Sequence, residues 1–581
     1  MKWRLPSRDI ILALTYSILL IIPDSMWIDT THGRMPYWAL WIYNLVFYFS
    51  LSLLLCQVAL WLKKLTRVLY VISHTILHVL TYGFSISNAF LYIFFTLRWD
   101  AYTFALVNET TGRESSEFLE TYVLTSECVW LVAGYILIAL VEYLAIRLTR
   151  QCHVSVPWYV SVPLGCLFLY NAVFFCQPDY SATYDTANDY NTIITRNMLW
   201  KLRLYAQQYD LEKDDLDICA QSQAATTIDS CSYTCPNMVV VIGESYIKRH
   251  SSLYGYNKPT NPSLEKFQKA GQLFVFNDVI TPRHGTSEAF KLFLSMARIQ
   301  DTIRWCDTPL FPALFKKAGY HVSFYSNQFV KESEKDREFV TGAGFFYHPG
   351  IEPYIIDERN HSFFEYDGEM VKAFVADHRQ SEAHPYNLAI FHLLGQHVAY
   401  KDRCPESMAR FSAKDYTDRK ELTADQKREV SEYDNATLYN DHVVASIIGL
   451  YKNQEAIVIY FSDHGEECND FRPHVGRSGD WDIIEKSLGI ECLRCQHDIP
   501  FVIYASPLYQ QKHPEIIEAI RGATERPFET DDLPHLLLHI AGIHTSWYDP
   551  QRDVISPSYD TTRRRVVSRV FTDYDEFCFG K

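Results

Sequence analysis

The stretch "VVVIGES", residues 239–245, ends a run of aliphatic residues on a glycine, a carboxylate and a hydroxyl. A continuous aliphatic run is typical of a strand buried on both faces of a sheet. Strands commonly end in polar turns, and Glu244 could be part of one. The sharper hypothesis is that Glu244 binds a metal ion at the strand end.

From residue 237 onward, the chain alternates strand-like and helix-like runs. The predicted strands are 238–243, 321–327, 386–395, 456–465 and 499–506. The predicted helices are 287–297, 309–318, 430–452 and 532–541. This alternation predicts an α/β sandwich with a largely parallel central sheet. In such sheets, functional side chains gather at the carboxyl ends of the strands.

Polar residues follow several of these predicted strands. Glu244 follows the first, Gln396-His397 follows the strand at 386–395, and "SDHGE" occupies 462–466. Carboxylate oxygens and imidazole nitrogens are normal ligands of zinc. The pattern therefore predicts a Zn²⁺ site that contains Glu244, Asp463 and His464, with a simple polar turn at 462–466 as the alternative.

A candidate nucleophile lies between the first two strands, in "TPRHGTSEAFKLFLSMA" at 281–297. Thr286 stands where a helical pattern begins, so its hydroxyl could simply cap the helix. The same position suits phosphate, because free N–H groups and the helix dipole attract anions. A hydroxyl bound to Zn²⁺ there would become an alkoxide nucleophile. Ser245 is the alternative nucleophile.

The first 176 residues are dominated by apolar runs, each long enough to cross a bilayer in roughly 20 residues. We expect five spans, at about 9–28, 37–62, 68–96, 122–146 and 155–175. The first could also be a signal peptide, but it lacks a convincing cleavage site and other spans follow it. We therefore predict a transmembrane domain at 1–176, a linker at 177–236 and a catalytic domain at 237–581.

Basic residues set the expected orientation of these spans. Clusters of basic residues lie before span one, between spans two and three, and between spans four and five. All of these clusters fall on one side of the membrane if the N-terminus is cytoplasmic. Everything after residue 176 then lies on the opposite face, which in a bacterium is the periplasm. The polar loop 97–120 lies there too, either as a solvated loop or as a platform for a lipid head group.

Cysteines and net charge limit the possible partners. Nine of the 14 cysteines follow residue 176, and an oxidising compartment would allow disulfides. Cys231/Cys235 and Cys492/Cys495 are candidate pairs, and a zinc site made of four cysteines is the rival interpretation. The net charge of −15 argues against a nucleic-acid partner.

Several motifs together resemble the membrane-anchored phosphoethanolamine transferases of Gram-negative bacteria. That family acts on lipid A or the lipopolysaccharide core, includes colistin-resistance proteins and belongs to the alkaline phosphatase and sulfatase superfamily. The motifs are "VVVIGES…SLYGYNKPTNPSL" (239–264), "HGTS" (284–287), "FHLLGQH" (391–397), "YDNATLYNDHVV" (433–444), "YFSDHGEE" (460–467), "HDIPFVIYAS" (497–506) and "DDLPHLLLHIAGI" (531–543). "ES" and "SLYGY" are more similar to the branch that modifies core sugars or periplasmic glucans.

The resemblance implies a role for each matching residue. Glu244, Asp463 and His464 match zinc ligands, and Thr286 matches the threonine that accepts phosphoethanolamine and also contacts zinc. His397 and His474 match histidines that bind substrate or additional zinc. Thr110 and Glu114 match a head-group motif, although Leu106 stands where the family has asparagine.

The resemblance further implies a two-step transfer from phosphatidylethanolamine to an envelope glycan, such as lipopolysaccharide, by a zinc-dependent enzyme of the inner membrane. We expect a monomer. A phosphoglycerol transferase, a periplasmic-glucan transferase and a non-catalytic membrane protein are the alternatives. A sulfatase activity would need a C/S-x-P-x-R pentapeptide, which the sequence lacks.

Overall fold

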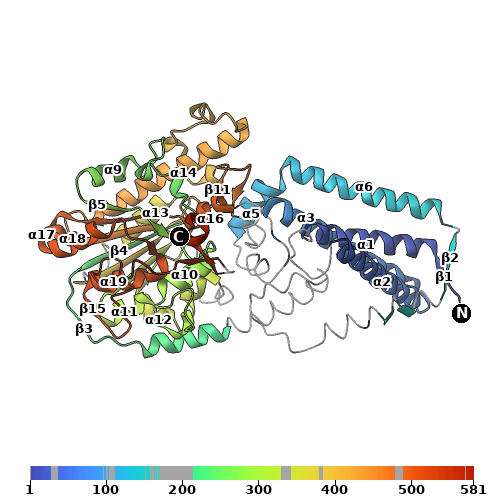
Figure 1. Cartoon of the computed structure of the whole chain (residues 1–581), viewed down its shortest axis with the longest axis horizontal. Coiled ribbons are helices and arrows are strands. Elements are labelled where there is room, and N and C mark those ends of the chain that lie inside the picture. Colours follow the sequence, from blue (N-terminus) through green and yellow to red (C-terminus); the bar gives the residue numbers. More distant parts are fainter. Residues whose placement is uncertain are drawn as a thin grey trace. The chain divides into compact units, whose positions relative to one another are not determined.

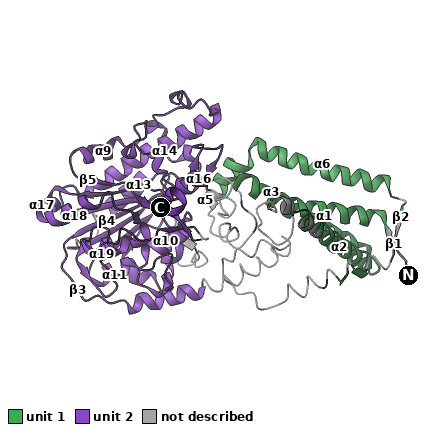
Figure 2. Cartoon of the chain, viewed as in Figure 1, with its two compact units in different colours: residues 1–209, 478–483 green, residues 210–477, 484–581 purple. Residues whose placement is uncertain are grey.

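The computed structural model describes the chain in two compact units (Figure 2): an N-terminal unit of residues 1–209 and 478–483, and a C-terminal unit of 210–477 and 484–581. The described residues are 2–27, 37–95, 97, 99, 103, 107, 112–150, 152–157, 162–163, 165–166, 169, 213–328, 342–378, 384–477, 489–568 and 571–580.

Long helices make up most of the described N-terminal unit (Figure 1). They are α1 (Ser7–Trp27), α2 (Tyr37–Lys63), α3 (Arg67–Phe95) and α6 (Ser126–Leu148), with the short α5 (Gly112–Phe118) before α6. Among the described residues, three segments are long and apolar enough to cross a membrane: Leu45–Lys63, Arg67–Phe95 and Ser126–Leu148.

The prediction of five spans is therefore not confirmed. The first predicted span forms helix α1 but is not among these three segments. Most of the fifth, 155–175, lies outside the described residues. Its first residues belong to β2 (His153–Pro157), which pairs antiparallel with β1 (Lys2–Pro6).

Ionisable side chains link the helices of the N-terminal unit. On α3, His74 Nε2 lies 3.6 Å from Asp9 Oδ1, and one turn later His78 Nδ1 lies 3.7 Å from Glu142 Oε1. Tyr82 Oη donates to Glu142 Oε2 at 3.0 Å. Ionisable groups within apolar helices are costly unless they find partners. These pairs therefore help to fix α1 and α6 against α3.

The C-terminal unit is built on a seven-stranded sheet. Its strands lie in the order β5 (Leu273–Phe276), β13 (Phe501–Ala505), β10 (Ala456–Ser462), β4 (Asn237–Gly243), β9 (Asn387–His392), β7 (His321–Ser326) and β8 (Glu358–Arg359). The five strands predicted from the sequence all form, and each lies inside this sheet. β5 and β8 were not predicted.

The sheet is mixed, so the prediction of a largely parallel sheet was wrong. β13 runs antiparallel to both of its neighbours, β10 and β5. The chain leaves β10 at its carboxyl end and enters β13 at Phe501, opposite Phe461 near that same end. Because the chain re-enters the sheet at the same end at which it left β10, β13 runs antiparallel to β10.

Alternate residues of β4 contribute to the cores on the two faces of the sheet. Val240 and Ile242 pack in one hydrophobic cluster, whereas Val239 and Val241 pack in the other. This explains the uninterrupted aliphatic run, because both faces of the strand are covered.

Helices cover both faces of the sheet (Figure 1). The first cluster includes side chains from α10 (Thr286–Leu294), α11 (Phe311–Lys317), α17 (Pro507–Lys512), α18 (Pro514–Ala523) and α19 (Leu533–Ala541). The second includes side chains from α9 (Pro262–Lys269), α13 (Asp367–His378) and α14 (Ala424–Tyr451). The four helices predicted from the sequence are α10, α11, α14 and α19.

The predicted linker and cysteine pairs can also be located. Described residues of the segment 177–236 include a helix at 213–225, and its Leu216 packs in the first cluster. The cysteines at 231, 235, 492 and 495 are all free thiols, so neither candidate disulfide forms.

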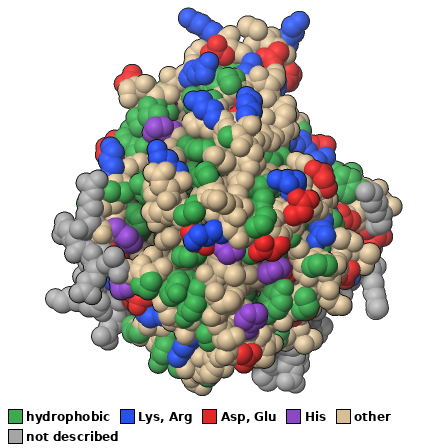
Figure 3. Space-filling view, turned by 90° about the vertical axis from the view of Figure 1, so that its left-hand side faces the viewer, with side chains coloured by type: hydrophobic (Ala, Val, Ile, Leu, Met, Phe, Trp, Pro, Cys, Tyr) green, Lys and Arg blue, Asp and Glu red, His purple; other side chains and the backbone are tan. Residues whose placement is uncertain are grey.

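On the face of the C-terminal unit shown in Figure 3, basic and acidic side chains are interspersed.

Candidate active site

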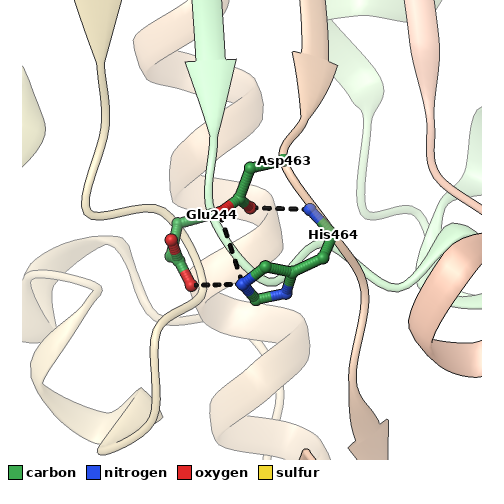
Figure 4. A group of neighbouring side chains, drawn as sticks. All are labelled: Glu244, Asp463 and His464. Atoms are coloured by element: carbon green, nitrogen blue, oxygen red, sulfur yellow. Dashed lines mark hydrogen bonds and ion pairs between the residues drawn. The ribbon is translucent and has the colours of Figure 1, made fainter. Parts of the chain in front are cut away.

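Two neighbouring strands carry the three predicted metal ligands to one point. β4 and β10 are parallel and end level with each other, with Gly243 opposite Ser462. Glu244 therefore emerges beside Asp463 and His464, and the three side chains converge (Figure 4). Their candidate ligand atoms all lie within 4.8 Å of one another, and all three residues are buried.

The imidazole of His464 faces both carboxylates through one nitrogen. Its Nε2 lies 3.2 Å from Glu244 Oε1 and 3.3 Å from Asp463 Oδ2. Its Nδ1 lies 2.9 Å from the carbonyl oxygen of Gly465, which can only accept a hydrogen bond. The proton of a neutral ring therefore sits on Nδ1, leaving the Nε2 lone pair directed at the cluster. Burial and the nearby Arg477 lower the pKa of His464, which favours that neutral ring.

The two carboxylates experience opposite electrostatic effects. Burial and the charge of Glu244 hold the pKa of Asp463 well above its usual range. Burial also acts to raise the pKa of Glu244, but its interactions with His464, His397 and Arg477 outweigh burial and hold that pKa well below its usual range. Two buried carboxylates at such close range favour a bound cation or a shared proton.

The donor set fits a metal ion such as zinc. Oδ2 of Asp463 is buried and accepts no hydrogen bond from the described residues, although it faces the same point as Glu244 Oε1 and His464 Nε2. Two carboxylates and one imidazole are within the usual ligand set of catalytic zinc. The three side chains therefore offer a converging set of ligand atoms that could hold a divalent cation.

Thr286 reaches this cluster from the start of α10. Its Oγ1 lies 3.2 Å from Glu244 Oε2 and 3.2 Å from His464 Nε2. The N-cap of α10 is Gly285, without a side-chain capping bond, and Thr286 is the first residue of the helix. Capping therefore does not account for the threonine, whose hydroxyl faces the cluster.

Ser245, the alternative nucleophile, is occupied differently. It has a left-handed backbone with φ of 56°, a conformation that a non-glycine residue adopts only when its surroundings enforce it. Its carbonyl oxygen accepts a hydrogen bond from Tyr433 Oη at 2.7 Å, and its Oγ donates to Glu244 Oε1 at 2.8 Å. The serine thus helps to orient the carboxylate.

Sequence reasoning missed two residues that contact the cluster. Gln328 Nε2 donates to Glu244 Oε2 at 2.9 Å and to the carbonyl oxygen of Leu393 at 2.9 Å. Arg477 Nη1 lies 2.8 Å from His464 Nε2. Gln328 follows the predicted strand 321–327, so the search for polar residues at strand ends could have found it. Nothing local in the sequence distinguishes Arg477.

The other predicted residues lie outside the cluster of three. His397 follows Gln396, whose N–H donates to the carbonyl oxygen of Glu244 at 3.0 Å. His474 precedes β12 (Val475–Gly476), and burial lowers its pKa to about 4. Glu114 belongs to α5, and Thr110 lies outside the described residues.

Comparisons with known proteins agree on one family. The sulfatase family profile matches residues 236–543. The phosphoethanolamine transferase EptC of Escherichia coli K12 is 28% identical over 540 residues, covering 90% of this chain and 86% of EptC. The transferase CptA of Salmonella typhimurium is 26% identical over 540 residues, covering 90% of this chain and 86% of CptA.

Solved structures show the same fold. The C-terminal periplasmic domain of E. coli EptC is 30% identical, with a TM-score of 0.52, and the match covers 61% of this chain and 96% of that domain. A structure of the same domain in complex with Zn gives a TM-score of 0.50. The integral membrane protein EptA of Neisseria meningitidis, at 17% identity, gives a TM-score of 0.60 over 94% of this chain and 98% of EptA.

Proposed function

This chain belongs to the sulfatase family. We propose that it transfers phosphoethanolamine from phosphatidylethanolamine to a glycan of the bacterial cell envelope. The observation that carries the proposal is the hydroxyl of Thr286, 3.2 Å from both a carboxylate and an imidazole of the buried cluster. Relatives named phosphoethanolamine transferases match over most of their length, including the N-terminal helical part.

Glu244, Asp463 and His464 would hold a zinc ion, with Thr286 beside it. The crystal structure of the EptC periplasmic domain with zinc supports the choice of metal. When bound, zinc would lower the pKa of a neighbouring hydroxyl and stabilise negative charge that develops on phosphoryl oxygens.

The chain's own residues supply the nucleophile and its orientation. In the first step, Thr286 Oγ1 attacks the phosphorus, the bond from phosphorus to the diacylglycerol oxygen breaks, and that oxygen takes up a proton. The proton of the threonine hydroxyl passes to Glu244 Oε2, its hydrogen-bond acceptor. Backbone N–H groups at the start of α10 face the phosphate, where a helix N-terminus favours negative charge.

In the second step, a hydroxyl or phosphate oxygen of the glycan attacks the same phosphorus and frees Thr286. The incoming oxygen loses its proton, and the threonine recovers one. His397 and His474 are proposed to bind substrate or to exchange these protons, and Thr110 with Glu114 to bind the ethanolamine head group.

The proposed location is the bacterial inner membrane, with the catalytic domain in the periplasm. Among the described residues, three helices able to cross a membrane support this location, as do the solved periplasmic domains of relatives. The donor is a lipid, so tethering the catalytic domain raises the effective donor concentration. Lipid A, the lipopolysaccharide core or a periplasmic glucan would be the acceptor.

Mass spectrometry of envelope glycans tests this function. Lipopolysaccharide and periplasmic glycans from cells that express the chain should gain the mass of one phosphoethanolamine, and cells with Thr286→Ala should not. Phosphatidylethanolamine labelled in its head group should pass the label to the glycan, whereas phosphatidylglycerol labelled in its head group should not. Identical spectra in every glycan fraction would contradict the transferase proposal, and label from phosphatidylglycerol would indicate a phosphoglycerol transferase.

A further inference from the structure

A pocket lies in the C-terminal unit, among residues that the catalytic proposal does not use. It has a volume of about 400 Å³, and its lining includes Arg249, Tyr254, Tyr256, Lys258, Tyr416 and Arg419. Aromatic and cationic side chains thus share one cavity, a combination that is suited to a ligand with both an apolar face and a negative charge.

The floor of this pocket is fixed by buried hydrogen bonds. Tyr256 Oη donates to Asp434 Oδ2 at 2.8 Å, and Tyr416 Oη donates to the same oxygen. Tyr254 Oη is held by the backbone of Phe501, as donor at 3.0 Å and acceptor at 2.8 Å. Tyr416 is fully buried, whereas Tyr254 and Tyr256 are partly exposed. Because their hydroxyls are engaged on the protein side, Tyr254 and Tyr256 offer mainly ring carbons to a ligand.

Positive charge surrounds these rings. Lys258 Nζ lies 5.0 Å from the centre of the Tyr416 ring and 3.4 Å from Asp418 Oδ1. Arg249 pairs with Glu491 and Arg419 with Glu421, and the two glutamate side chains are 47% and 61% exposed. Exposed ion pairs contribute little to stability, so an incoming anion can replace these carboxylates at low cost.

The pocket lies at the same edge of the sheet as the catalytic cluster. Its residues 249–258 follow Glu244 at the carboxyl end of β4. The loop that follows His464 at the end of β10 reaches the pocket too, since Arg419 Nη2 donates to the carbonyl oxygen of Asn469 at 2.7 Å. His250 joins the two loops through Asp470 Oδ1 at 3.0 Å. The loop after β4 therefore lines the pocket, and the loop after β10 contacts one of its lining residues, Arg419.

We propose that this pocket binds a phosphorylated sugar of the acceptor glycan. The partly exposed rings of Tyr254 and Tyr256 would pack against the apolar face of the sugar. The Asn257 amide and Asp418 carboxylate, which also line the pocket, would hydrogen-bond its hydroxyls. Lys258 and Arg419 would bind the phosphate by charge-assisted hydrogen bonds. This proposal rests on the proposed function in one respect, namely that the acceptor is a glycan.

Titration calorimetry on the full chain in detergent tests the pocket with three probes: glucose 6-phosphate, glucose and inorganic phosphate. We expect glucose 6-phosphate to bind at least about tenfold more tightly than either other probe, because only it engages rings and cations together. The double variant Lys258→Gln/Arg419→Gln should weaken its binding by at least about tenfold.

The matched control is Lys269→Gln, which removes a charge from a side chain on α9 that is 75% exposed and paired with Glu265. It should leave the binding of glucose 6-phosphate unchanged. All variants should unfold within about 3 °C of the unaltered chain, since none of the replaced side chains is fully buried. Thermal unfolding therefore separates lost binding from lost folding.

Two results would overturn the proposal. If the double variant binds glucose 6-phosphate as tightly as the unaltered chain, the binding belongs elsewhere, for example at Thr286. If inorganic phosphate binds as tightly as glucose 6-phosphate, the pocket is only an anion site. The titration requires no turnover, so its result stands whether or not phosphoethanolamine transfer is detected, and either proposal can fail alone.

Discussion

At the scale of single residues, the candidate active site depends on which atom each polar side chain contacts. Two hydroxyls lie near Glu244, those of Ser245 and Thr286, and each contacts a different carboxylate oxygen. Only Thr286 also contacts His464 Nε2 and stands at a helix start, where a phosphate can bind. The proximity of a hydroxyl to Glu244 therefore does not identify the nucleophile, whereas the whole set of contacts favours Thr286.

Replacing each hydroxyl separately tests this assignment. Thr286→Ala should lower transfer from labelled phosphatidylethanolamine by at least about a thousandfold, because the nucleophile is lost. Zinc content, measured by elemental mass spectrometry, should remain, since three ligands are left. Ser245→Ala should retain measurable transfer. The reverse outcome, with activity lost only in Ser245→Ala, would make Ser245 the nucleophile.

Gln328 is predicted to position a metal ligand. Gln328→Leu preserves much of the side-chain volume but removes the amide that donates to Glu244 Oε2. Zinc affinity, measured by competition with a chelator, should fall about 10–100-fold, as is usual when a residue that orients a ligand is lost. Gln223→Leu is the matched control, because Gln223 is equally buried but bonds to Cys219 and Thr308. An equal loss in both variants would show a general effect on folding.

At the scale of elements, the turn after β9 holds Glu244 in place. Gly395 has φ of +52°, and a Cβ there would stand 2.8 Å from the amide nitrogen of Glu244 and 2.9 Å from its carbonyl oxygen. Any side chain at this position would therefore be strained and would push against the backbone of Glu244. The close packing of two loops at this sheet edge thus requires a glycine.

Gly395→Ala should lower the free energy of unfolding by about 1–3 kcal/mol, measured by urea denaturation. Zinc affinity should fall with it, because Glu244 must move. Gly449→Ala is the control, since Gly449 lies in α14 with no neighbouring atom within 4 Å of an added Cβ. It should be neutral or stabilise the chain by up to about 1 kcal/mol. Equal stability of the two variants would contradict the close approach seen at Gly395.

The loops after β4 and β10 are joined by a buried, pH-dependent interaction. Burial alone would lower the pKa of His250, but the carboxylates of Asp470 and Asp434 raise it to about 10. In the unfolded chain, the pKa of a histidine side chain is about 6.5. The contribution of His250 to stability is therefore complete below about pH 6.5 and declines as pH rises towards 10. The difference in unfolding free energy between the unaltered chain and His250→Gln should shrink over that range. A difference that stays constant from pH 6 to 10 would refute the charged pairing.

At the scale of the whole molecule, the C-terminal unit (Figure 2) carries its own sheet, a core cluster on each face of that sheet, and the buried cluster of Glu244, Asp463 and His464. The corresponding domain of EptC has been crystallised without its membrane part. A unit with its own core can fold independently. The N-terminal helices are therefore expected to serve the lipid donor and not the folding of the catalytic domain.

A fragment of residues 210–581 should unfold cooperatively and bind zinc with the affinity of the full chain. Its rate of transfer from phosphatidylethanolamine in vesicles should drop by about 10²-fold or more, because the effective concentration given by the tether is lost. Circular dichroism, chelator competition and vesicle assays measure the three properties. A fragment that transfers as fast as the full chain would show that the tether is unnecessary.

Features that neighbouring residues encode could be predicted from the sequence alone. Continuous aliphatic runs predicted the central strands, because strands buried on both faces need apolar residues at every position. The polar residues after two of those strands predicted which side chains would meet, and the structure brings Glu244, Asp463 and His464 together. The start of α10 at Thr286 was likewise predicted to within one residue.

Features that depend on contacts between distant segments became evident only in the folded chain. The reversal of β13 makes the sheet mixed, because that strand starts beside the end of β10. Gln328 and Arg477 approach the cluster from segments far apart in the sequence. The tyrosine pocket likewise joins residues 249–258 with 416–419. Burial and periodicity are local properties that a sequence displays directly, whereas contacts between distant segments follow from how strands and loops pack in three dimensions.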